Sequence, residues 1–304
     1  MFAVDKLISY TARIISTYQR INTKHINTKH INVSTYQHYL ICKSTHFFRY
    51  FHFSTSDFQF SSYLCLCLYP LQYYATPMNI IIIANGLFPE KPWVDTLLGG
   101  ADRVVCCDGA IEKYLGWHSR QTLLPDHSVD VVGDGDSLDP ALIAEARRRG
   151  VDVHHYAVEE QEYNDLTKAT RHAVAEARRA GIADSEIAID YIGATGLRED
   201  HTLGNISLLA YYMEQYPGMA FRMVGDYGVF EPMQGRRRFA SHAGQQVSLF
   251  SLTPDVPVTV SGLRWPIEGR CLTSWWQGTL NEAVGDTFEV QGGRMIVFEL
   301  RIEN

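Results

Sequence analysis

The pattern of apolar and polar positions divides the chain into three parts, with changes at Met78 and near Pro217. In the middle part, short strand-like runs, most of them rich in apolar residues, alternate with segments in which apolar residues recur at helical spacing. The runs cover residues 79–84, 103–107, 129–132, 151–156 and 187–192, and the helical segments cover 93–98, 110–114, 142–149, 165–180 and 203–213. Such alternation is typical of βαβ units. We therefore predict a Rossmann-like, mostly parallel sheet with flanking helices in residues 78–217.

Residues 218–304 show shorter runs separated by turn residues. They lie at 221–224, 229–232, 245–252, 256–260, 286–291 and 294–302. The last run alternates apolar Ile296, Phe298, Leu300 and Ile302 with mostly polar residues, as expected of a half-buried antiparallel strand. Gly292-Gly293 between the last two runs predicts a two-residue hairpin. The pattern favours a small, all-β second domain, which we expect to be an antiparallel β-sandwich.

Residues 1–77 differ from the remainder in composition. They contain no Gly and no Glu, carry seven basic and two acidic residues, and repeat the sequence Ile-Asn-Thr-Lys-His at Ile21 and Ile26. One interpretation is a basic, Ser/Thr-rich leader, and another is an additional domain. We favour a third interpretation, in which they are translated upstream sequence and the working protein starts at Met78. We assign them no fold.

Composition narrows the function classes. Hydrophobic residues make up 46% and charged residues 20% of the chain, as in soluble globular proteins. The formal charge of −7 gives no support to nucleic-acid binding. We expect no membrane span, because no long uninterrupted apolar segment occurs. The six cysteines lack zinc-type spacing and suggest reduced thiols in a cytoplasmic protein.

A pair of acidic residues follows the third apolar run of the middle part. Asp134 and Asp136 stand one residue apart after Gly133, and Asp139-Pro140 then opens a helix. A solvated acidic turn is one interpretation. The other is a metal site, because close carboxylates repel each other unless a cation lies between them. Carboxylate oxygens suit Mg²⁺, and the carboxyl ends of parallel strands are where open α/β sheets bind ligands.

Further polar residues stand at the predicted ends of strands. Asp165 and Lys168 begin a helix, where Asp165 is either a helix cap or part of a site. The loop after residue 192 contains Gly193, Gly196 and Arg198, a combination suited to phosphate, followed by Asp200. In the last part, the pair Trp275-Trp276 is either core or a flat surface for a planar ligand.

Together these stretches resemble the thiamine pyrophosphokinase family from Met78 to the C-terminus. The similar motifs are Asp108-Gly109-Ala110, Gly133–Ser137, Asn164–Lys168, Gly193–Asn205 and Gly278–Glu282, which occur in the family's order. The chain departs from the family pattern at Gly135, Asn164, Leu197 and Leu280, where the family usually has an aromatic residue, Thr, Gly and Ser. The change at Leu280 concerns the part that the family places near thiamine.

The resemblance implies a Mg²⁺-dependent transfer of diphosphate from ATP to the hydroxyethyl oxygen of thiamine, which yields thiamine diphosphate and AMP. It implies a catalytic, ATP-binding domain in residues 78–217, and a thiamine-binding domain in residues 218–304 that also forms a homodimer with the active site near the subunit interface. The expected metal ligands are Asp134, Asp136 and Asp165, and Asp200 and Arg198 complete the catalytic set. The expected phosphate or ATP contacts are Asp108, Gly109, Ser137, Gln161, Lys168, Gly193, Gly196 and Arg198, and the expected thiamine contacts are Trp276, Thr279 and Asn281.

Two other functions fit parts of the sequence. Asp134-Gly135-Asp136 is also compatible with the metal-binding acids of a nucleotide-sugar glycosyltransferase, although no sugar-acceptor region is evident. The departures from the family motifs are compatible with a thiamine or nucleotide binder that has no catalytic activity.

Overall fold

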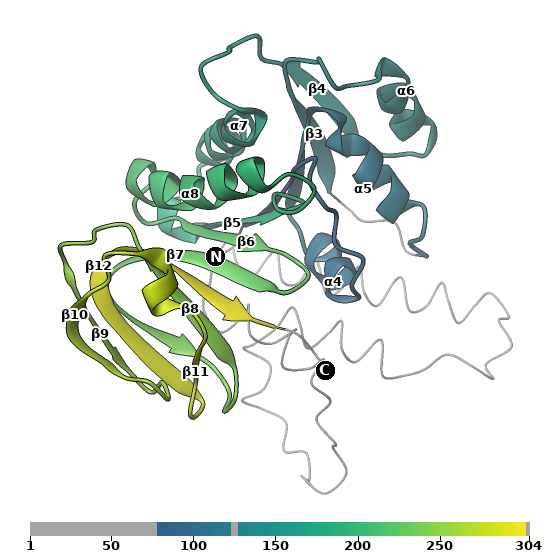
Figure 1. Cartoon of the computed structure of the whole chain (residues 1–304). Helices are drawn as coiled ribbons and strands as arrows, with labels where there is room; N and C mark the ends of the chain where they lie inside the picture. Colours follow the sequence, from purple (N-terminus) through teal and green to yellow (C-terminus); the bar gives the residue numbers. More distant parts are fainter. Residues whose placement is uncertain (1–77, 123–126, 302–304) are drawn as a thin grey trace, which may run out of the picture. The chain divides into compact units, whose positions relative to one another are not determined.

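The computed structural model describes residues 78–122 and 127–301 (Figure 1), so the predictions for residues 1–77 and for Ile302 lie outside the described residues. The first part of the fold comprises β1 (Met78–Ile83), α4 (Trp93–Gly99), β2 (Arg103–Cys107), α5 (Ile111–His118), β3 (Ser128–Gly133), α6 (Pro140–Arg148), β4 (Val153–Ala157), α7 (Asp165–Arg179), β5 (Ile187–Ile192), α8 (Glu199–Gln215) and β6 (Ala220–Val224). Each strand and helix predicted for residues 78–217 is present, with ends displaced by a few residues at most.

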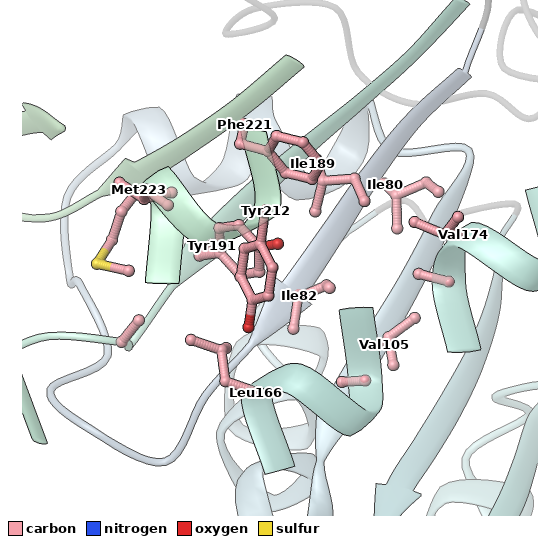
Figure 2. Close-up of a cluster of buried hydrophobic side chains, with 14 of the residues drawn as sticks. Ile80, Ile82, Val105, Leu166, Val174, Ile189, Tyr191, Tyr212, Phe221 and Met223 are labelled. Carbon is pink, nitrogen blue, oxygen red and sulfur yellow. The ribbon is translucent and has the colours of Figure 1, made fainter. Parts of the chain in front are cut away.

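These strands form a parallel sheet in the order β4-β3-β2-β1-β5-β6. Strands β1, β2, β3 and β5 are buried on both faces, which explains their mostly apolar sequences. Helices α7 and α8 pack on one face, around Ile80, Tyr191 and Tyr212 (Figure 2). Helices α4, α5 and α6 pack on the other face against Ile81 and its neighbours. The helix-cap prediction at Asp139 is confirmed, because its Oδ1 accepts a hydrogen bond from the Ala141 N–H at 2.8 Å.

The C-terminal part is rich in strands and continues the same sheet. It contains β7 (Gly228–Ala240), β8 (Gln246–Ser251), β9 (Pro257–Ser261), β10 (Ile267–Cys271), β11 (Asn281–Glu282) and β12 (Thr287–Leu300). Strand β7 pairs antiparallel with β6, and β12 pairs antiparallel with β7, β8 and β9. Phe239, Phe288 and Val297 belong to its apolar core. The protein thus has a mixed α/β sheet with a strand-rich C-terminal region. The Rossmann-like and β-sandwich descriptions, and the domain division at residue 217, stay predictions.

The hairpin prediction at Gly292-Gly293 is wrong. Strand β12 runs without reversal from Thr287 to Leu300, and its pairing with β7 shifts by one residue between Gly292 and Met295. A Cβ on Gly293 would lie 1.9 Å from Thr253 Oγ1. The glycine is therefore needed for close packing beside a β-bulge rather than for a turn.

Among the described residues, no helix is both long enough and apolar enough to cross a membrane.

Candidate active site

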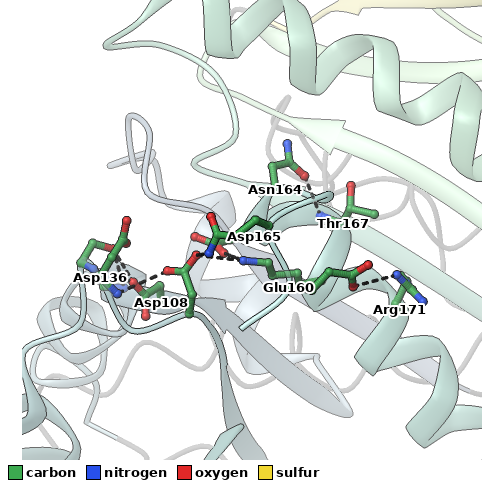
Figure 3. A network of polar contacts seen from close by, with 12 residues as sticks. Asp108, Asp136, Glu160, Asn164, Asp165, Thr167 and Arg171 are labelled. Atoms are coloured by element: carbon green, nitrogen blue, oxygen red, sulfur yellow. Dashed lines mark hydrogen bonds and ion pairs between the residues drawn. The ribbon is translucent and has the colours of Figure 1, made fainter. Parts of the chain in front are cut away.

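Acidic side chains from two neighbouring strand ends meet at the carboxyl edge of the parallel sheet. Asp108 follows β2, and Asp134 and Asp136 follow β3, which pairs directly with β2. Each of the three offers one carboxylate oxygen, and these three oxygens lie within 4.8 Å of one another. We call Asp108, Asp134 and Asp136 the acid cluster. Figure 3 shows Asp108 and Asp136 beside Asp165, which comes from the start of α7.

Asp108 is the buried member of the acid cluster, with 1% of its surface exposed. Its Oδ2 accepts hydrogen bonds from the Ser137 N–H at 2.8 Å and the Ser137 hydroxyl at 2.6 Å, whereas its Oδ1 is buried with no hydrogen-bond partner among the described residues. Its backbone has φ +45°, a conformation that is costly for a residue with a side chain. A strained, buried carboxylate with an unsatisfied oxygen fits a bound cation.

The two other members differ in their electrostatics. A hydrogen bond from the Lys168 ammonium, at 3.0 Å from Oδ2, and another from the Asp136 N–H hold the pKa of Asp134 below its ordinary value. The pKa of Asp136 is raised, chiefly by repulsion from Asp134. This repulsion is the strain that a divalent cation between the carboxylates would relieve. An all-carboxylate set suits Mg²⁺, so the donor chemistry of the residues present fits that ion.

Lys168 joins the acid cluster to helix α7. Its side chain is 3% exposed, and its Nζ lies 3.0 Å from Asp134 Oδ2 and 3.1 Å from Asp165 Oδ1. Burial alone would lower the pKa of Lys168, but the two carboxylates outweigh it and raise the pKa. The pKa of Asp165 is also raised, mainly by burial. Gln161 Nε2 is 3.4 Å from Asp134 Oδ2, at the limit of a hydrogen bond. Asp165 is thus linked to the acid cluster by Lys168, whose ammonium contacts both Asp165 and Asp134.

Asn164, rather than Asp165, caps helix α7. The Asn164 Oδ1 accepts a hydrogen bond from the Thr167 N–H at 3.0 Å (Figure 3). Of the two interpretations of Asp165, the structure thus excludes the cap. The Asp165 carboxylate is free of that task and binds the ammonium of Lys168 instead.

The glycine loop, residues 193–196, lies against the loop that follows β1. Gly86 N–H donates to the Gly193 carbonyl at 2.6 Å, and a Cβ on Gly193 would lie 2.6 Å from the Ala84 carbonyl oxygen. This close approach explains the glycine at residue 193. Beyond the loop, Arg198 donates two hydrogen bonds to Asp200, at 3.1 and 2.5 Å, and holds the pKa of Asp200 at about 2. Both side chains are exposed, 68% and 65%.

The third group of predicted site residues lies in the strand-rich region. Trp276 is 74% exposed, and its carbonyl accepts a hydrogen bond from the Thr279 hydroxyl at 2.8 Å. Asn281 is buried, and its amide binds the N–H and carbonyl of Trp265 at 3.1 and 2.6 Å. Asn281 thus fixes the segment that carries the half-exposed indole of Trp265, while Trp276 offers an open aromatic face.

Sequence reasoning assigned Asp108 to phosphate binding and did not foresee its place among the acids. The available signal was its position directly after a buried strand that neighbours the strand before Asp134, because such strand ends lie side by side. Ser137, expected to contact phosphate, uses its N–H and hydroxyl to bind Asp108 in this structure. Gly109 lies so close that a Cβ would be 2.6 Å from the Ser137 carbonyl oxygen.

Comparison with protein-family models gives two matches. The model described as the catalytic domain of thiamin pyrophosphokinase matches residues 94–220, and the model of its substrate-binding domain matches residues 228–298. Together the two matches span about two thirds of the chain. No curated protein sequence gives a significant match.

Several solved structures share the fold. Thiamin pyrophosphokinase from Candida albicans is 18% identical with a TM-score of 0.60, over 74% of this chain and 89% of that chain. The enzyme from Bacillus subtilis is 20% identical with a TM-score of 0.59, over 74% and 100%. The yeast enzyme is 15% identical with a TM-score of 0.59, over 74% and 86%. At these identities the likeness establishes the fold.

Proposed function

The chain belongs to the thiamin pyrophosphokinase family, and we propose that it uses Mg²⁺ and ATP to convert thiamine into thiamine diphosphate and AMP. The match to the family's catalytic domain favours an enzyme over a binder without activity, and over a glycosyltransferase. The observation that carries the metal-dependent part is the acid cluster, in which Asp108 keeps a buried oxygen without a hydrogen-bond partner among the described residues.

In this reaction the hydroxyl oxygen of thiamine attacks the β-phosphorus of ATP. The bond from that phosphorus to the bridging oxygen of the α-phosphate breaks, AMP leaves with the electron pair, and the hydroxyl proton passes to water. Mg²⁺ would neutralise charge on the phosphates, and Asp108, Asp134 and Asp136 are the residues placed to hold it. Asp165 is a ligand only if Lys168 releases it, because the two are paired at 3.1 Å.

The protein's own cations have separate tasks in this proposal. Lys168 is buried and fixed, so it orients Asp134 and presents positive charge beside the phosphates. Arg198 is exposed and can exchange Asp200 for a phosphate group, for which its fork of donors is suited. Asp200, with its pKa near 2, suits the orientation of Arg198 or the binding of a cation better than the acceptance of the hydroxyl proton.

For thiamine we propose the region around Trp276, Thr279 and Asn281. The open indole face of Trp276 suits a planar cation such as the thiazolium ring. The exposed apolar side chains of Trp276, Leu280 and Val284 support a homodimer, because large exposed apolar groups mark contact surfaces. The described cysteines, Cys106, Cys107 and Cys271, are free thiols, which supports a cytoplasmic location.

The test incubates the full-length chain with thiamine, ATP and Mg²⁺ and then separates nucleotides and thiamine species. We expect AMP and thiamine diphosphate in equal amounts, and no product after chelation of the metal. Asp136→Asn should lower kcat/KM by about 100-fold or more, whereas Glu159→Gln, which changes an exposed carboxylate on a nearby loop, should stay within about twofold of the unaltered chain. ADP with thiamine monophosphate would contradict diphosphate transfer, and full activity in chelator would contradict the metal.

A further inference from the structure

Strand β3 and helix α7 are joined by two successive polar contacts. Asp134 binds Lys168 at 3.0 Å, and Asp130 binds His172 at 2.9 Å. Asp130 lies near the start of β3 and Asp134 follows its carboxyl end, whereas Lys168 and His172 are four residues apart on one face of the helix. Only the first contact involves the proposed site.

The second contact lies in the interior of the protein. The Asp130 side chain is 1% exposed, and its Oδ2 accepts hydrogen bonds from Arg103 Nη1 at 2.6 Å and from His172 Nε2. Burial would raise the pKa of Asp130, but the hydrogen bonds from His172 and Arg103 outweigh it and hold the pKa below its ordinary value. Asp130 is therefore ionised at neutral pH. An ionised carboxylate only accepts, so Nε2 of His172 carries the donated proton.

His172 is also held from a second side. The ring of Tyr156, on β4, lies against the His172 ring with centroids 4.3 Å apart and planes tilted by 44°. The imidazole is thus fixed by a charge-assisted hydrogen bond along its plane and by an aromatic contact on its face. The His172 side chain is thus restrained both along and across the plane of its ring.

We propose that His172 is a positioning residue, whose contact with Asp130 sets the register of α7 on β3 and so holds Lys168 between Asp134 and Asp165. The proposal rests on the proposed function, in which Lys168 acts at the acid cluster. An apolar contact would hold the helix to the sheet at lower desolvation cost, because burying an ion and its partners rarely adds net stability. What the directional hydrogen bond adds is a fixed register. Catalysis depends on such precision, since a displacement of about 1 Å can lower the rate about 100-fold.

The first experiment measures the position of Lys168 without reference to activity. Acetic anhydride modifies lysine amines in the intact full-length chain, and mass spectrometry gives the rate at each lysine. Lys168 is 3% exposed and should react slowly, whereas Lys91 is exposed and should react fast. In His172→Phe, which keeps a ring but removes the donor, we expect Lys168 to react about tenfold faster. In His172→Gln, whose amide can restore the donor, the rate should return to within about threefold.

His155→Phe is the matched control. His155 lies on β4, pairs with Val131 rather than with Asp130, and is exposed. It should leave the labelling of Lys168 and the activity unchanged. If His172→Phe does not fold, Asp130→Asn keeps the shape of the partner, removes its charge, and should raise the labelling rate in the same direction. An unchanged labelling rate of Lys168 in both variants would overturn the proposal, whether or not the enzyme is active.

The second experiment is a double-mutant cycle with Lys168→Gln. We expect His172→Phe to lower kcat about tenfold or more in the unaltered chain, with a smaller change in KM, and to have little further effect once Lys168 is replaced. An equal loss in both backgrounds would mean that His172 serves the fold alone, and would overturn the positioning role. An inactive unaltered chain would refute the proposed function instead, and the labelling rate of Lys168 would then decide by itself whether His172 sets the position of that lysine.

Discussion

Ser137 donates two hydrogen bonds to a single oxygen of Asp108, from its N–H at 2.8 Å and its hydroxyl at 2.6 Å. The contact joins the segments that follow β2 and β3, and its two residues lie 29 residues apart in the sequence. It also turns the other oxygen of Asp108 toward a buried position where no described group binds it. Ser137 follows Asp134 and Asp136 in the sequence. The orientation of Asp108, the third potential metal ligand, therefore depends on a serine beside the other two.

Ser137→Ala removes one of the two hydrogen bonds and should loosen Asp108. We expect the Mg²⁺ concentration for half-maximal activity to rise several-fold and the free energy of unfolding to fall by about 1 kcal/mol, the usual loss for one hydrogen bond. Metal titration of activity and urea unfolding measure these two quantities. Ser119→Ala, which removes an exposed hydroxyl bonded to a helix carbonyl, is the control. Equal metal dependence in the two variants would contradict the role given to Ser137.

Gly133 permits the approach of Asp108 to the end of β3. A Cβ at this residue would lie 2.7 Å from Asp108 Cβ and 2.9 Å from its Oδ1. Gly133→Ala should therefore displace Asp108, lower the free energy of unfolding by about 1–3 kcal/mol, and reduce activity about 100-fold. Gly116→Ala places the same methyl group in open space on helix α5 and should stabilise by about 0.5–1 kcal/mol. Urea unfolding and steady-state kinetics compare the two variants. Equal stability and activity in both would refute a steric conflict between a Cβ at residue 133 and Asp108.

Local patterns predicted most of the parallel region, because its central strands are mostly apolar and helices α6 and α7 begin at capping residues. They failed where the structural role of a residue depends on partners that are distant in the sequence. Gly292-Gly293 signals a turn locally, but Thr253 packs against it and the strand bulges instead. Asp130 is a single polar residue in an apolar strand, and its partner His172 lies 42 residues away. No spacing rule connects such a pair.

Leu197 and Leu280, at two of the positions where the sequence departs from the family pattern, have backbones in the left-handed region. Their φ values are +65° and +59°, and their side chains are 71% and 69% exposed. This conformation costs a leucine about 1–2 kcal/mol, and exposed side chains return little of it. Leu197→Gly should therefore raise the free energy of unfolding by about 0.5–1 kcal/mol after the greater entropy of unfolded glycine is counted.

Leu203→Gly is the control of opposite sign. Leu203 is also exposed, at 55%, but lies inside helix α8. There glycine should lower the free energy of unfolding by about 1 kcal/mol. Thermal and urea unfolding give the stability change for the same Leu-to-Gly substitution in a left-handed backbone and in a helical one. A loss of stability in both would show that the left-handed backbone at Leu197 is not strained.

Glu299 is a buried acid in the C-terminal strand, 1% exposed, with its Oε2 lacking a hydrogen-bond partner among the described residues. Burial, reinforced by the charge of Glu231, raises its pKa from 4.5 to about 7. The unfolded chain releases this proton near pH 4.5, whereas the folded chain keeps it until about pH 7. Folding is therefore favoured at low pH, and this contribution is lost as the pH rises through that interval.

Glu299→Gln keeps the shape of the protonated acid and cannot ionise. Relative to the unaltered chain, its free energy of unfolding should be similar at about pH 4.5 and higher at about pH 8, by an amount on the order of 3 kcal/mol. Urea unfolding at the two pH values measures the difference. Glu289→Gln is the control, because hydrogen bonding to Arg236 lowers the pKa of Glu289, so that this substitution should bring no gain at the higher pH. A difference for Glu299→Gln that stays constant between the two pH values would show that Glu299 is ionised throughout. The charges of Arg222, Arg237 and Arg301, which lower its pKa, would then outweigh its burial.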